Sequence, residues 1–347
     1  MITNPTPQRA LRGHLPTRPT PRAATTGEHH AALAAHLTPR DRWLARMCFE
    51  HRVFTTHQIV HLTYPSLRAA NHRLRELYLW RVLDRFQPFL SCGTAPMHYV
   101  LDIAGATALA HEDGLPPKAL GYRHEAAIGL AHSLRLAHTI GVNGFFATLV
   151  ATSRQPHATG QLTAWWSETR CARHFGDLVR PDAYGRWHEA DRELEFFLEF
   201  DFGTEALSVL ASKLTGYHQL ATTTGITTPV LVWLPTTRRE ATARQALAQA
   251  HSHLDHPDLV PVATSSADLP RTEPTNTPAT SRWLPLPDPA PRRPGRLRLA
   301  DLAHRWPTTA TPHTTPASTP RHGTEPATTL APPSPLPPPQ PAYRITP

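Results

Sequence analysis

The stretch RPDAYGRWHEADRELEFFLEFDFGTEALSVLASKLTGY, residues 180–217, decides how the centre of this chain folds. Residues 193–202 alternate between two faces, as a strand does. One face holds Leu194, Phe196, Leu198, Phe200 and Phe202, and the other holds Glu193, Glu195, Phe197, Glu199 and Asp201. We expect this strand to pair with residues 179–187 through the turn GRWHEAD, and a helix to follow from Thr204 to about Thr222.

Strand and helix patterns continue on both sides of this stretch. The expected strands are residues 162–168, 229–234 and 259–263, and a further helix is expected over residues 238–253. A helix from His124 opens this part of the chain, with its apolar positions at Ile128, Leu130, Leu134, Leu136 and Ile140. The alternation predicts an α/β sandwich around a mixed sheet over residues 120–266.

Residues 37–115 have a different order of elements. Helical patterns come first, with Leu44, Met47 and Cys48 on one face, then a segment opening at Thr55, then residues 66–79. Extended segments follow at residues 81–90 and 98–103, before another helix from about Ala104. Three helices and a hairpin are the order of a winged helix-turn-helix, so we expect an α+β chain overall.

Both ends of the chain read as disordered tails. Residues 1–36 are rich in proline, threonine and arginine, and residues 270–347 hold 21 of the 38 prolines. We place the C-terminal tail at residues 267–347. Its segment PRRPGRLRLADLAHRW, residues 291–306, is open to two interpretations, a helix formed on a partner or a solvated basic linker.

The charge balance favours a polyanionic partner. The chain has 35 Lys and Arg against 27 Asp and Glu, a net charge of +8, and a pI near 9.9. Only Lys118 and Lys213 are lysines, so part of this basicity reflects the arginine preference of a high-GC genome. Three widely spaced cysteines and no apolar leader predict a cytoplasmic protein without a membrane span.

The third helix of residues 37–115 looks like a recognition helix for double-stranded DNA. Leu67, Ala70, Leu74 and Leu77 form an inward stripe. The residues expected to contact DNA lie outward or near the following hairpin, and are Arg68, Asn71, His72, Arg73, Arg75, Arg81 and Arg85. A small helical domain that binds protein through a basic face is the alternative.

Three carboxylates are expected to converge in the second domain. Glu199 and Asp201 project from one side of their strand, and Asp182 lies on the neighbouring strand. Oxygen ligands in this arrangement suit a hard divalent cation, Mg²⁺ or Mn²⁺, of the kind used in phosphodiester hydrolysis. The alternative is a solvated strand edge without chemistry.

The chain here resembles the core of the PD-(D/E)xK nuclease superfamily and, more closely, the replication-relaxation family of actinobacterial and plasmid proteins. The second resemblance covers roughly residues 38–265. It rests on LTPRDRWLARMCFEHRVFTTHQIVHLTY, HEAAIGLAHSLRLAHTIGVNGFF, RPDAY and FFLEFDFGTEALSVLASKLTGYHQL. It implies a winged helix joined to a restriction-endonuclease-like domain, and a role in plasmid replication and DNA relaxation.

One departure from the nuclease pattern bears on activity. The position two residues after Glu199, where the superfamily has lysine, is Asp201. By the resemblance, Lys213 on the following helix is the substitute cation, which makes Asp182, Glu199 and Lys213 the catalytic candidates. Three hypotheses stay open: an accessory DNA-binding protein of plasmid or mobile-element replication or transfer that works with replication or relaxase proteins, a metal-dependent nickase, and a transcriptional regulator.

Overall fold

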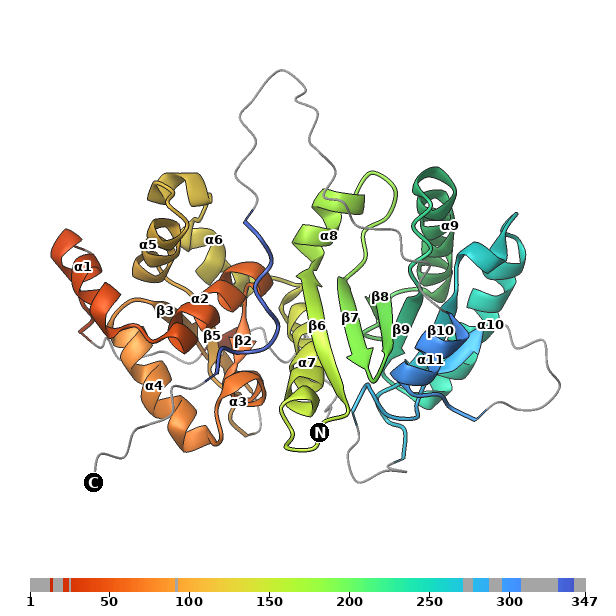
Figure 1. Ribbon diagram of the computed structural model, residues 1–347, viewed down its shortest axis with the longest axis horizontal. Coiled ribbons are helices and arrows are strands. Elements are labelled where there is room, and N and C mark those ends of the chain that lie inside the picture. The colour runs from red at the N-terminus through yellow and green to blue at the C-terminus, as the bar shows by residue number, and fades with distance from the viewer. Residues whose placement is uncertain are drawn as a thin grey trace, which may run out of the picture. The chain divides into compact units, whose positions relative to one another are not determined.

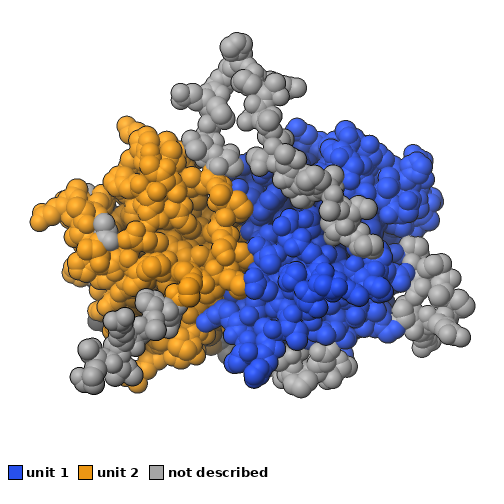
Figure 2. Space-filling model, viewed as in Figure 1, with its two compact units in different colours: residues 1–5, 144–325 blue, residues 6–143, 326–347 orange. Residues whose placement is uncertain are grey.

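The computed structural model describes residues 13–14, 21–24, 26–90, 93–270, 277–286, 295–306 and 330–339 (Figure 1). The chain divides into two compact units (Figure 2). Unit 1 comprises residues 1–5 and 144–325, and unit 2 comprises residues 6–143 and 326–347. Each unit mixes helices with a β-sheet, so the predicted α+β class is confirmed.

The helices of unit 2 begin at well-formed caps. Its main helices are α1 (Gly27–His36), α2 (Pro39–His51), α3 (Thr56–Thr63), α4 (Leu67–Leu79) and α5 (Ile103–Glu112). Thr38 and Asp41 form a capping box at the start of α2, and Thr55 and Gln58 form another at the start of α3. These caps satisfy backbone N–H groups that would otherwise lack partners, and they fix where each helix begins.

A small antiparallel sheet completes the centre of unit 2. Its strands are β2 (Phe54–Thr55), β5 (His98–Leu101) and β3 (Leu83–Phe86), in that spatial order. A second pair joins β1 (Gly13–His14) to β4 (Pro88–Phe89). The predicted hairpin is therefore present, and its second strand β5 lies in the centre of the sheet, because it also pairs with the short strand that precedes α3.

The expected helix from His124 to Ile140 is interrupted. After the turn η2 (Pro117–Leu120), the chain forms α6 (His124–Ile128), the turn η3 (Gly129–His132) and then α7 (Leu136–Ser153). Leu134 lies in the break and is 78% exposed, so its prediction as an apolar contact was wrong. In the described residues no single helix has the length and apolar character to span a bilayer, although the bent pair Pro117–His132 and Leu136–Ser153 meets the test together.

Unit 1 is built on a six-stranded mixed sheet. Its spatial order is β11 (Leu284–Leu286), β10 (Val262–Ser266), β9 (Val230–Leu234), β8 (Arg192–Phe200), β7 (Ala183–Glu189) and β6 (Gly160–Ser167). The pairs β6/β7 and β7/β8 are antiparallel, the pairs β8/β9 and β9/β10 are parallel, and β11 is antiparallel to β10. The predicted strands of residues 162–263 are thereby confirmed.

Helices cover both faces of this sheet. On the Phe197 face, α9 (Leu207–Thr224) and α10 (Thr237–Ser252) pack against each other and over β8, β9 and β10. On the opposite face, Phe145 and Phe146 of α7 pack against Phe196, Trp165 and Trp233, among other rings. The short helices α8 (Glu168–Phe175) and η4 (Pro257–Leu259) complete the unit. Alternate side chains of β8 thus enter two different layers. One layer is aromatic, and the other also contains the carboxylates of this strand.

Parts of both predicted tails are folded. Helix α1 lies within residues 1–36, and strand β11 and helix α11 (Leu299–Arg305) lie within residues 267–347. Trp283 is fully buried, and the side chain of Arg244 donates to the carbonyls of Leu284 and Pro285. These long-range contacts order a segment whose local sequence pattern predicts neither a helix nor a strand. Much of the rest of the two predicted tails lies outside the described residues.

Candidate functional site

Asp182 is placed beside the end of β8 by the pairing of two strands. Its backbone N–H donates to the carbonyl of Leu198 over 3.1 Å, and its carboxylate accepts the backbone N–H of Phe200 at 2.8 Å. Ala183, the first residue of β7, is paired with Leu198. Asp182 therefore lies directly before the start of β7, beside Glu199 of β8.

Glu199 is buried and held by two side chains of α9. The ammonium nitrogen of Lys213 lies 2.6 Å from Oε2, and the hydroxyl of Tyr217 donates to Oε1 over 2.5 Å. Glu199 is 1% exposed, whereas the side chain of Lys213 is 29% exposed. Lys213 thus links a buried carboxylate to the solvent-facing side of α9.

The proton affinity of this group is shifted. Burial raises the pKa of Glu199 to about 7, the charge of Asp182 adds to the rise, and Lys213 and Tyr217 act against it. Burial by itself lowers the pKa of Lys213, but the carboxylates of Glu199 and Asp182 outweigh this and raise it overall. The carboxyl of Glu199 is therefore poised to gain or lose a proton near neutral pH, beside an ammonium that stays charged.

Asp201 faces the same side of the sheet but has other partners. The guanidinium of Arg239 on α10 forms an ion pair with its carboxylate, and one of its nitrogens donates to Oδ1 over 3.0 Å. The backbone N–H of Gly203 also donates to Oδ1, at 2.8 Å. In the described part of the chain, the ligand atoms of Asp182, Glu199 and Asp201 do not form a group within 4.8 Å of one another. The structure brings Asp182, Glu199 and Lys213 together and ties Asp201 to a different helix.

The arrangement fits a divalent cation at two of the three expected carboxylates. Mg²⁺ in proteins is commonly held by one or two carboxylates and completes its shell with water and phosphate oxygens. Asp182 and Glu199 are such a pair, although a cation at Glu199 shares that carboxylate with Lys213. Asp201 does not fit, because Arg239 already neutralises it.

Tyr217 belongs to this site and was not among the predicted site residues. It lies one helical turn after Lys213, so the (i, i+4) spacing on α9 turns both side chains toward Glu199. Burial raises the pKa of Tyr217 well above its usual range, and the charge of Glu199 adds to this. The phenol therefore stays neutral and acts as a hydrogen-bond donor.

Helix α4 in unit 2 carries an exposed polar face. Ala70, Leu74 and Leu77 are buried, as predicted. The exposed side chains are those of Arg68, Asn71, His72 and Arg75, together with Leu67, which is 45% exposed and was wrongly expected in the core. Among the described residues, Arg68 and Arg75 have no ion-pair partner. Within the described part of the chain, this face is thus exposed to solvent.

Three arginines expected at the DNA contact are engaged within unit 2. Arg73 forms ion pairs with Asp41 at 2.5 Å and with Glu76 at 2.7 Å. Arg81 lies 3.6 Å from the buried carboxylate of Asp102. Arg85 stacks over the ring of Tyr78, 4.2 Å from its centroid. Arg73 thereby ties α4 to the start of α2, and Arg85 ties the strand β3 to α4.

These two regions, the α4 face and the Glu199 site, fall within one family match. The model of the replication-relaxation family matches residues 46–256. The chain belongs to the replication-relaxation family. No curated protein and no solved structure gives a significant match to the chain. The match spans α4, Asp182, Glu199 and Lys213 in this replication-relaxation protein.

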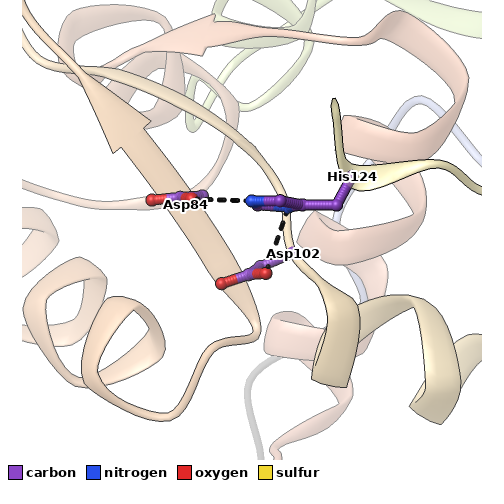
Figure 3. A group of neighbouring side chains, drawn as sticks. All are labelled: Asp84, Asp102 and His124. Carbon is purple, nitrogen blue, oxygen red and sulfur yellow. Dashed lines mark ion pairs between the residues drawn. The ribbon is translucent and has the colours of Figure 1, made fainter. Parts of the chain in front are cut away.

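A second charged cluster lies in unit 2 and joins four segments of the chain. His124 lies between two carboxylates, 3.4 Å from Asp84 and 3.3 Å from Asp102 (Figure 3). Arg22 forms ion pairs with both carboxylates, and Arg81 approaches Asp102. The arginines already supply the positive charge that the two aspartates require, so we assign this cluster to the stability of unit 2.

Proposed function

We propose that this replication-relaxation protein is a DNA-binding accessory factor of plasmid or mobile-element replication, relaxation or transfer. In this proposal unit 2 is a winged helix that docks on double-stranded DNA, and the protein acts in the cytoplasm beside replication or relaxase proteins. The order of α2, α3, α4 and the sheet β2-β5-β3 supports the winged-helix assignment. The observation that carries the proposal is the exposed face of α4.

The chemistry of that face suits a DNA groove. Arg68 and Arg75, which have no ion-pair partner among the described residues, can contact phosphates or the O6 and N7 atoms of guanine. Asn71 can pair with the N6 and N7 atoms of adenine. Because the apolar side of α4 is packed into unit 2, a ligand meets this polar side. Unit 1 is a scaffold in this proposal and needs no active site.

A gel-shift assay on plasmid DNA tests the proposal. The double variant Arg68→Ala/Arg75→Ala is expected to lose at least tenfold in affinity, since each lost arginine contact is worth about 1 kcal/mol or more. The matched control, Arg192→Ala/Arg238→Ala, removes the same charge from exposed positions of unit 1. Equal weakening by both double variants would show that net charge alone drives binding and would refute a role for α4.

A second candidate function is supported by one specific observation, the meeting of Asp182, Glu199 and Lys213. The order α7, β6, β7, β8, α9, β9 and the place of these residues in it resemble the PD-(D/E)xK nuclease core. We propose as the alternative a Mg²⁺- or Mn²⁺-dependent DNA nickase. Asp182 and Glu199 would hold the cation, which when bound polarises the phosphate and activates water. Lys213 would stabilise negative charge on the cleaved phosphate.

The two candidates separate in one experiment on supercoiled plasmid. Wild type, Asp182→Ala, Glu199→Ala and Lys213→Ala are incubated with Mg²⁺ or Mn²⁺, and both the gel shift and the nicked product are scored. Nicking by wild type alone, with DNA binding intact in the variants, would support the nickase. Equal shifts without nicking in every lane would support the accessory factor. A shift confined to one defined sequence would instead favour a transcriptional regulator.

A further inference from the structure

A proline-rich segment near the C-terminus lies on unit 2. Residues 330–339, LAPPSPLPPP, belong to this unit although they follow unit 1 in the chain. The indole N–H of Trp43 donates to the carbonyl of Ser334 over 2.7 Å. Figure 1 shows the segment, coloured blue, crossing the unit that contains α2. This contact joins residues 291 positions apart, so a side chain of α2 holds a segment that is distant in the sequence.

The composition of the segment suits docking. Six of its ten residues are prolines, which have no backbone N–H and restrict the free chain to extended conformations. Such a segment loses little conformational entropy when it binds, and it presents carbonyl groups that need donors. An indole N–H is a donor without an acceptor, so Trp43 matches what the segment lacks.

The contact is local and well packed. Trp43 is 7% exposed, and Pro335, directly after Ser334, is buried. The backbone bends at Pro335 and Leu336, where the hydroxyl of Ser334 donates to the carbonyl of Leu336 over 3.2 Å. Pro335, the buried residue of this bend, directly follows the residue whose carbonyl accepts from Trp43. A site of this geometry recognises a proline-rich segment through one backbone carbonyl and one proline ring.

We propose that unit 2 carries a binding site for proline-rich segments centred on Trp43, and that its resident occupant is the chain's own residues 330–339. The segment acts as a latch, because it ties the chain that leaves unit 1 back to unit 2. The 23 residues 307–329 connect α11 covalently to the latch. A tether of this length gives an effective concentration in the millimolar range, which keeps a weak site occupied.

Binding of a fluorescein-labelled LAPPSPLPPP peptide to the full chain, followed by fluorescence anisotropy, tests the latch. The full-length variant Pro332→Gly/Pro333→Gly/Pro335→Gly weakens the resident segment and opens the site. It is expected to bind the peptide about tenfold more tightly than wild type, in which the tethered segment competes. A peptide with glycine at every proline is the control ligand and is expected not to bind.

The role of Trp43 is tested in the opened variant. Adding Trp43→Phe keeps an aromatic ring but removes the N–H, and is expected to weaken the peptide at least tenfold, whereas Trp306→Phe in unit 1 leaves it unchanged. Equal binding to wild type and the opened variant would overturn the proposal, and this comparison does not depend on how well the Trp43 variant folds. A wild-type dimer that dissociates when the tail prolines are replaced would overturn the intramolecular occupant.

Discussion

The ammonium of Lys213 on α9 and the carboxylate of Glu199 on β8 lie 2.6 Å apart, with the carboxylate buried and the lysine partly exposed. This pair places a cation beside the acidic residues of a strand that has Asp201 where the nucleases that the sequence resembles have lysine. The same pair fills the site of the nickase hypothesis and stabilises the buried end of β8. Its two roles are separable, because stability is measured without DNA.

Removing the Lys213 ammonium leaves a buried carboxylate without its cation. Lys213→Met is expected to lower the free energy of unfolding by about 2–3 kcal/mol at pH 8, where Glu199 is ionised. The loss shrinks at pH 5, since a protonated Glu199 needs no cation. Urea unfolding at both pH values measures this. Lys118→Met, at the other lysine of the chain, removes an exposed charge and is the control.

The raised pKa of Glu199 makes stability fall as pH rises. In the folded state the carboxyl of Glu199 keeps its proton up to about pH 7. In the unfolded state it loses this proton near pH 4.5, the ordinary pKa of a glutamate. Between these values the folded state binds more protons, so wild type loses up to about 3 kcal/mol relative to Glu199→Gln. Paired unfolding curves from pH 4.5 to 8 in EDTA test this. A constant difference between the two proteins across this range would contradict it.

The guanidinium of Arg239 is the counter-ion of the buried Asp201 carboxylate. Arg239→Ala leaves a carboxylate that is 1% exposed without its guanidinium, and is expected to cost about 3 kcal/mol of stability. The double variant Asp201→Asn/Arg239→Ala is expected to recover part of this loss, because the uncompensated charge is gone. Thermal unfolding of the wild type, both single variants and the double variant gives the coupling energy. Independent, additive effects would show that the pair is not coupled.

Gly185 leaves room for the aromatic layer of unit 1. A Cβ at this position would lie 2.5 Å from the ring of Phe196 and 2.7 Å from the ring of Phe146. Gly185→Ala is therefore expected to destabilise the protein by about 1–3 kcal/mol through overpacking. The control is Gly129→Ala, where an added Cβ meets nothing within 4 Å. Comparable losses from the two variants would count against the packing explanation.

Local sequence patterns predicted much of the candidate site. The period of two along β8 put Glu199 and Asp201 on one face, whereas Lys213 was expected at this site only from the resemblance to the nucleases. Two partners escaped prediction because they depend on packing between distant elements. Tyr217 is one tyrosine among several until α9 is docked, and Arg239 comes from α10.

The same limit explains the errors in unit 2 and at the C-terminus. The period of α4 predicted Ala70, Leu74 and Leu77 in the core, but Leu67 in its first turn extends beyond the packed surface. Arg73, one of the residues expected to contact DNA, also forms an ion pair with Asp41 at the cap of α2, a contact that the period of α4 does not predict. The proline-rich composition around β11 and α11 predicted neither element, because these segments are ordered by long-range contacts and not by their local sequence.

The salt dependence of duplex binding tests the central claim, that the α4 face contacts DNA, most directly. The affinity of wild type and Arg68→Ala/Arg75→Ala for a fluorescent duplex is measured from 50 to 300 mM KCl. If both arginines contact phosphates, the slope of log K against log salt concentration becomes shallower by about 0.9 for each, and affinity falls. Unchanged affinity and slope in this variant would contradict the account and move the DNA contact, if any, away from α4.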